Sequence, residues 1–110
     1  MKRKKIYVCA PFSGTPEQMK QNTIKTCSIC RNLYEQGVEP VAPQLYYPRF
    51  LREEDQKERR DGLDAGLEWL EQCDEIWVFG DRVTEGMRAE VRFAEAHNIP
   101  IQFVKEGPYD

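Results

Sequence analysis

Short apolar runs separated by longer amphipathic stretches are the feature that most constrains this fold. Each run is long enough for one strand, and Pro11 and other breakers bound the runs, which lie at residues 5–10, 38–42, 74–80 and 99–104. The stretches between them carry apolar residues at helical spacing, at residues 16–36, 51–72 and 84–97. Strands that alternate with helices in this way predict a parallel sheet with right-handed crossovers.

Local signals place the helix ends. Thr15 and Gln18 form a capping-box pattern around Pro16, which suits a first helical position, and Gly37 suits the position just after a helix. In the second helix the charged runs 52–55 and 57–61 predict a solvated face, and the buried stripe is predicted at Leu63, Leu67 and Leu70.

These elements predict one α/β domain over residues 1–110. We expect a Rossmann-like (flavodoxin-like) three-layer sandwich, with a four-stranded parallel sheet of order 2-1-3-4 and helices on both faces. In such sheets ligands bind beyond the carboxyl ends of the strands. This rule gathers residues 10–15, 42–48, 80–87 and 105–109 onto one edge.

The composition of the sequence limits the classes of partner that the protein can bind. The net charge is −3, with acidic and basic residues interleaved, so a nucleic acid polymer is not expected as a partner. The sequence lacks the run of ~20 apolar residues that a membrane span needs, and a strand follows the first residues in place of a signal-peptide core. We therefore expect a cytoplasmic protein that does not engage membranes.

Neither the cysteines nor the single histidine predicts a metal or redox site. Cys27 and Cys30 have the spacing of a redox or zinc pair, but they fall in mid-helix, away from a helix N-terminus that would stabilise a thiolate. Cys9 and Cys73 have no second ligand close in sequence. All four are expected to be buried small residues, and His97 to end the last helix.

Two strand-to-helix junctions meet at the expected edge. Backbone N–H groups and the hydroxyls of Ser13 and Thr15 favour an anion at the first junction, and Thr84 to Gly86 form a second one. The alternative is that these hydroxyls only cap their helices.

Glu90 lies on the predicted inner stripe of the last helix, on the face of Met87 and Ala94. A carboxylate there costs free energy unless it is paired or hydrogen-bonded, and if ionised it can serve as a nucleophile. The alternative is a surface ion pair with Arg88, Arg92 or Arg59.

Tyr46 and Tyr47 follow the second strand in a loop rich in tyrosine and proline. Their rings can stack on a base or cover a sugar, and a hydrophobic plug or a subunit contact is the alternative.

Three stretches resemble a known family. They read IYVCAPFSG at residues 6–14, GLEWLEQCD at 66–74, and TEGMRAE at 84–90 with Ala94 after it. They are similar to the nucleoside 2-deoxyribosyltransferase family, which includes 2′-deoxynucleoside 5′-phosphate N-hydrolases, and most of all to its short bacterial and phage members. The similarity spans nearly the whole chain.

The resemblance implies a covalent mechanism. In that family a glutamate four residues after a glycine attacks C1′ of the deoxyribose, and Glu90 follows Gly86 at that spacing. Six residues before the glutamate the hydrolases carry a serine, to which Thr84 is similar. The resemblance implies sugar or phosphate contacts at Ser13, Gly14 and Thr84. The substrate contacts that we expect in all are Phe12, Ser13, Gly14, Tyr46, Tyr47, Thr84, Gly86, Met87 and Arg88, without a cofactor or metal.

The sequence departs from the family at three positions. Gly66 stands where the family has an aspartate, with Asp61 and Asp64 nearby, and Arg88 and Arg92 stand where small residues are usual. An acid must still help the base to leave, and Asp64 and Asp81 are the candidates.

Two functions follow. The first is cleavage or transfer at the N-glycosidic bond of a 2′-deoxynucleoside or its 5′-monophosphate, with Glu90 as nucleophile. The alternative is a non-catalytic module that senses or sequesters a nucleotide or an ADP-ribose-like metabolite. In both cases the partner is a small molecule, and a homo-oligomer is expected.

Overall fold

A parallel four-stranded sheet forms the middle layer of the protein. The computed structural model describes residues 3–104, so the expectation for residues 105–109 lies outside the described part. The strands are β1 (Lys5–Cys9), β2 (Glu39–Val41), β3 (Glu75–Phe79) and β4 (Ile101–Val104). All pairings are parallel and the order is β2-β1-β3-β4, which confirms the predicted sheet.

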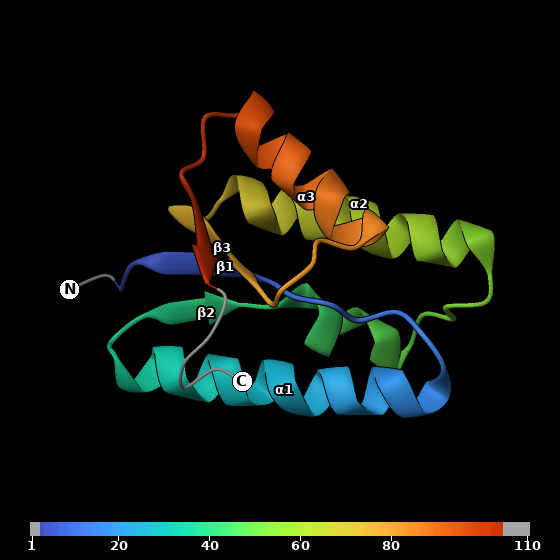
Figure 1. Cartoon of the computed structure of the whole chain (residues 1–110). Coiled ribbons are helices and arrows are strands. Elements are labelled where there is room, and N and C mark those ends of the chain that lie inside the picture. The colour runs from blue at the N-terminus through green and yellow to red at the C-terminus, as the bar shows by residue number, and fades with distance from the viewer. Residues whose placement is uncertain (1–2, 105–110) are drawn as a thin grey trace.

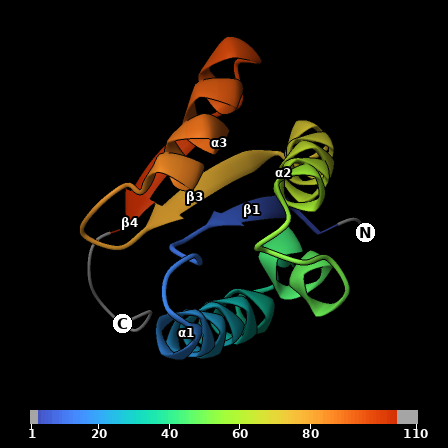
Figure 2. The same cartoon turned by 90° about the vertical axis from the view of Figure 1, so that its right-hand side faces the viewer.

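Helices cover both faces of this sheet (Figures 1 and 2). Helix α1 (Pro16–Glu35) lies on one face, and α2 (Gln56–Glu71) and α3 (Glu85–Ala96) lie on the other. Two apolar clusters result. Ile29 and Leu33 of α1 pack with Val8 and Phe79, whereas Leu70 of α2 packs with the opposite side of the sheet. The three-layer α/β sandwich is therefore as predicted.

Burial on both faces explains why the central strands read as continuous apolar runs. Residues 6–9 of β1 are all buried, as are Ile76, Val78 and Phe79 of β3. Tyr7 is the residue with a polar end in the β1 run, and its hydroxyl needs a hydrogen-bond partner at this depth.

The ends of α1 form as the sequence predicts. The Thr15 side chain accepts a hydrogen bond from the Gln18 N–H, and the Gln18 side chain accepts one from the Thr15 N–H, with Pro16 in the first turn. After the helix, Gly37 has φ of 86°, a conformation that favours glycine.

The second helix begins later than predicted. The structure shows α2 from Gln56, and residues 51–55 are not helical. Asp55 is the reason, because its carboxylate accepts hydrogen bonds from the N–H groups of Lys57 and Glu58 and so caps the helix. Before it, the loop contains two short 3-10 helices, η1 (Pro43–Leu45) and η2 (Tyr47–Arg49).

The cysteine prediction is right for two positions. Cys9 and Cys73 are buried, Cys30 is half-buried, and Cys27 is exposed, because it lies on the outer face of α1. Among residues 3–104 no cluster of three or more His, Cys, Asp or Glu side chains could hold a metal ion. No helix in the described part is long and apolar enough to cross a membrane.

Truncating one leucine on each face of the sheet tests this layering. Leu33→Ala and Leu70→Ala each remove a fully buried side chain, and we expect each to lower the free energy of unfolding by about 2–5 kcal/mol. Ile24→Ala, on the exposed side of α1, should change it by no more than about 0.5 kcal/mol. Urea denaturation of the three variants measures the difference, and a small effect of Leu33→Ala alone would show that α1 is not part of the core.

Candidate functional site

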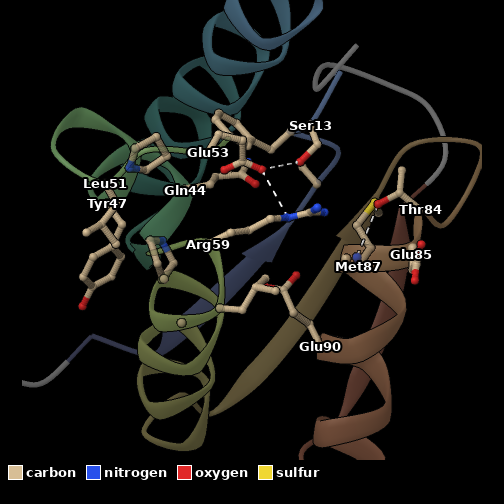
Figure 3. A pocket seen from close by; sticks show the side chains of 18 of the residues that line it. Ser13, Gln44, Tyr47, Leu51, Glu53, Arg59, Thr84, Glu85, Met87 and Glu90 are labelled. Atoms are coloured by element: carbon tan, nitrogen blue, oxygen red, sulfur yellow. Dashed lines mark hydrogen bonds and ion pairs between the residues drawn. The ribbon is translucent and has the colours of Figure 1, made fainter. Parts of the chain in front are cut away.

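A cavity of about 270 Å³ opens at the carboxyl end of the two central strands (Figure 3). It lies between the β1–α1 loop, the loop and 3-10 segment after β2, α2, and the first turns of α3. Its apolar wall includes Phe12, Pro43, Tyr47, Pro48, Leu51, Leu63 and Met87. An apolar cavity of this size with a few polar groups suits one small molecule.

Glu90 reaches this cavity from the second turn of α3 and is half-buried. Its carboxylate accepts a hydrogen bond from the Tyr7 hydroxyl, and the nearby Cys9 thiol donates to the Met87 carbonyl oxygen at 3.9 Å. Burial raises the pKa of Glu90 above its usual range, and the neighbouring Tyr7 hydroxyl and Cys9 thiol partly oppose this shift. The side chain is therefore a desolvated carboxyl group held by a neutral donor.

The surface ion pair that would explain Glu90 otherwise is not present in the described part of the chain. Arg88 and Arg92 are exposed and do not line the cavity. Arg59 does line it, but its partner is Glu53. The hydrogen bond from Tyr7, and not an ion pair, stabilises the Glu90 carboxylate at this position.

Tyr7 and Gly66 fit together behind Glu90. Burial and the neighbouring Glu90 raise the pKa of Tyr7 well above its usual value, so the phenol stays neutral and can donate its proton in a hydrogen bond. A Cβ at Gly66 would lie 3.2 Å from the Tyr7 hydroxyl oxygen, closer than almost all such contacts. The absence of a side chain at position 66 thus leaves room for the phenol.

A charged cluster stands at the mouth of the cavity. The Ser13 hydroxyl donates to Glu53 Oε1 at 3.0 Å, and Arg59 Nε lies 3.5 Å from the same oxygen (Figure 3). Arg52 and Glu58 also line this region, and the Glu58 carboxylate accepts a hydrogen bond from the Arg52 N–H at 2.8 Å. Arg52 and Arg59 are exposed, as predicted for a solvated face, whereas Glu53 and Glu58 are half-buried, because the late start of α2 folds residues 51–53 over the cavity.

The N-terminus of α3 supplies the opposite wall. The Thr84 side chain accepts a hydrogen bond from the Met87 N–H at 3.3 Å, so Thr84 caps the helix and also lines the cavity. Gly86 and Glu85 line it beside them. Capping and contact with a ligand are thus not exclusive alternatives for Thr84.

The structure divides the residues predicted for the site. The cavity is lined by Phe12, Ser13, Tyr47, Thr84, Gly86, Met87 and Glu90, and not by Gly14, Tyr46, Asp64, Asp81 or Arg88. Asp64 is exposed because it lies two residues from both Gly62 and Gly66, which face the cavity, so the helix turns it away. Asp81 is exposed in the turn after β3.

Gly14 and Tyr46 do not line the cavity, and each has a structural role elsewhere. A Cβ at Gly14 would lie 2.4 Å from Gln18 Oε1, so the missing side chain allows the capping box of α1 to close. The Tyr46 ring is exposed and packs edge-on against Tyr47 and Phe50.

The sequence interpretation missed several lining residues, chiefly Tyr7, Gln44, Glu53 and Arg59. Tyr7 carried a usable signal, a hydroxyl within a run of buried aliphatic residues. Glu53 and Arg59 carried none, because a charged residue beside α2 is usually solvated.

Comparisons with known proteins agree with this architecture. The chain belongs to the family described as Domain of unknown function (DUF7768), whose model matches residues 4–104. A solved structure of a 2-deoxyribosyltransferase from Bacillus psychrosaccharolyticus is similar, with a TM-score of 0.64 and 22% identity over 90% of this chain and 70% of that one. The curated proteins contain no match. The structural likeness shows a shared fold.

The raised pKa of Glu90 predicts a dependence of stability on pH. The folded state keeps the Glu90 proton at pH values where the unfolded chain has lost it, so this residue lowers the free energy of unfolding as the pH rises from the usual glutamate range through its folded pKa. Glu90→Gln removes this loss. We expect the variant to gain stability over the wild type as the pH rises, with a plateau above the folded pKa.

Urea denaturation at a series of pH values measures this gain. Glu95→Gln, an exposed position on the same helix, controls for the loss of one carboxylate. A stability difference between Glu90→Gln and the wild type that grows as the pH falls would contradict the assigned direction.

Proposed function

We propose that this protein cleaves or transfers at the N-glycosidic bond of a 2′-deoxynucleoside or its 5′-monophosphate, with Glu90 as the nucleophile. One observation carries the proposal: a desolvated carboxyl group, hydrogen-bonded by Tyr7, faces a small and largely apolar cavity at the carboxyl ends of β1 and β3. The fold shared with a 2-deoxyribosyltransferase supports it.

Glu90 forms the covalent bond in this mechanism. One carboxylate oxygen attacks C1′ of the deoxyribose, the C1′–N bond breaks, and its electron pair leaves with the base. Water or a second base then attacks C1′ and releases the carboxylate, so that two inversions retain the configuration. A carboxylate nucleophile forms this intermediate without a metal ion or an organic cofactor.

Tyr7 positions the nucleophile. Its neutral hydroxyl binds Oε2 of Glu90, which orients the carboxylate. The same hydrogen bond stabilises the anion that burial disfavours.

The departing base needs a proton, and the expected donors Asp64 and Asp81 do not face the cavity. Glu53, Glu58 and Glu85 are the other carboxyl groups that line it among residues 3–104. Glu53 is paired with Ser13 and Arg59, so we propose that the proton comes from Glu58 or Glu85, directly or through water.

A non-catalytic module that binds a nucleotide or ADP-ribose-like metabolite is the second candidate. Gly66 favours it, because no carboxylate occupies the position where the resembling family has one. Arg88 and Arg92, the other departures from that family, do not bear on this choice, since both are exposed away from the cavity. We further propose that the protein is a cytoplasmic homo-oligomer.

Glu90→Gln tests the proposed function. Glutamine keeps the size and much of the hydrogen bonding but cannot bond to C1′ as a carboxylate does, so base release from a panel of deoxynucleosides and deoxynucleotides should be lost while ligand binding persists. Chromatography of the free base measures its release, and calorimetry measures ligand binding. Release by the variant at the wild-type rate would exclude Glu90 as nucleophile. Binding by both proteins without release by either would favour the binding module.

The two adjacent tyrosines offer a matched comparison. Tyr47 lines the cavity and its hydroxyl accepts a hydrogen bond from the Trp69 side chain at 3.0 Å, whereas Tyr46 is exposed. Tyr47→Ala should weaken nucleoside binding by about 1–3 kcal/mol through lost ring contact, and Tyr46→Ala should have little effect. Equal losses of affinity and melting temperature in both variants would favour a structural role for the pair.

A further inference from the structure

We propose that Glu53 makes this site select an unphosphorylated nucleoside over the corresponding 5′-monophosphate. This inference rests on the proposed function, because it states which of two substrate classes the cavity takes. It starts from the cluster of Ser13, Glu53 and Arg59 at the cavity mouth, which joins the β1–α1 loop to the segment around the start of α2 (Figure 3).

Glu53 engages two of the groups that would otherwise attract a phosphate at this wall. The Ser13 hydroxyl donates its proton to Glu53 Oε1, and the Arg59 guanidinium faces the same oxygen. A phosphate could use the Ser13 hydroxyl proton and the Arg59 Nε–H only by displacing the carboxylate. It would then stand beside a like charge, since Glu53 itself lines the cavity.

Donor and acceptor chemistry separates the two ligands. A carboxylate only accepts hydrogen bonds, and a sugar hydroxyl can donate one to it. A phosphate monoester near neutral pH presents acceptor oxygens and carries about −1.5 to −2 charges. Glu53 therefore complements the 5′-hydroxyl of a nucleoside and repels the 5′-phosphate of a nucleotide.

The rest of the cavity adds to this preference. Among the described lining residues, the acidic Glu53, Glu58, Glu85 and Glu90 outnumber the basic Arg52 and Arg59. Arg59 already faces Glu53, which leaves little cationic field for an entering dianion.

The helix N-termini are the features that would favour a phosphate, and one N–H group of each is already capped by a side chain. At α3 the Met87 N–H donates to Thr84, and Glu85 places a negative charge in the first turn. At α1 the Gln18 N–H donates to Thr15, and Pro16 has no N–H to offer.

Glu53→Gln tests the inference by removing the charge with little change of shape. For matched pairs of deoxynucleosides and their 5′-monophosphates, we expect wild-type kcat/KM to favour the nucleoside, and the variant to move this ratio at least about tenfold toward the monophosphate. Glu68→Gln, an exposed glutamate on α2 outside the cavity wall, should leave the ratio unchanged. Structural damage would lower both activities together and would not move the ratio.

Three outcomes overturn the proposal: a wild-type preference for the monophosphate, equal use of both, or an unchanged ratio in Glu53→Gln. Each would leave the proposed cleavage intact, because base release would still occur. Glu53→Ala should shift the ratio in the same direction, and it serves as the second variant should the glutamine form not fold.

Calorimetry in the Glu90→Gln background separates specificity from chemistry. The nucleoside should bind more tightly than its monophosphate, and Glu53→Gln added to this background should reverse or remove the difference. If no wild-type turnover occurs but this binding pattern holds, the proposed reaction is wrong and the selectivity stands. If neither ligand binds, both are wrong.

Discussion

The pairing of β1 with β3 is the constraint on which the site depends. The two strands are parallel neighbours, with Ile6 opposite Glu75, Tyr7 opposite Ile76 and Cys9 opposite Val78, although Ile6 and Glu75 are 69 positions apart in the chain. Their carboxyl ends therefore lie side by side. The loop that carries Ser13 and the helix that carries Glu90 start from these ends and meet over one cavity.

Burial of this strand pair also leaves two polar groups, the Tyr7 hydroxyl and the Glu90 carboxylate, in need of hydrogen-bond partners. Tyr7 is buried in the sheet and its hydroxyl needs an acceptor, while Glu90 lies on the inner side of α3 and its carboxylate needs donors. Each group satisfies the other, and the lack of a side chain at Gly66 leaves the phenol its place. A polar pair at this depth is costly to disrupt, because either partner left alone would be buried without a hydrogen bond. The same contact keeps the carboxylate oriented toward the cavity.

At the cavity mouth the polar groups are partly exposed to solvent, unlike the buried pair of Tyr7 and Glu90. Glu53 and Arg59 are partly exposed, so their ion pair contributes little to stability. Its effect is on the field and the donors that a ligand meets on entry. On the proposed selectivity, an interior that holds one carboxyl group by a neutral donor and a mouth where Glu53 pairs with Ser13 and Arg59 together favour a small, neutral, hydroxyl-bearing ligand over an anionic one.

The sequence by itself determined the order of strands and helices, because buried parallel strands need continuous apolar runs and helix caps need particular side chains, as at Thr15 and Gly37. It also marked Glu90, since a carboxylate on an inner helical stripe conflicts with the local pattern. The start of α2 was missed because the Asp55 cap was hidden within a run of charged residues.

Only the tertiary structure decided which groups meet at the site. The partner of Glu90 lies 83 positions away, and that of Ser13 lies 40 away, so no local pattern relates them. Asp64 and Asp81 point elsewhere for the same reason: the direction of a side chain depends on how its element packs, and packing is a property of the whole fold.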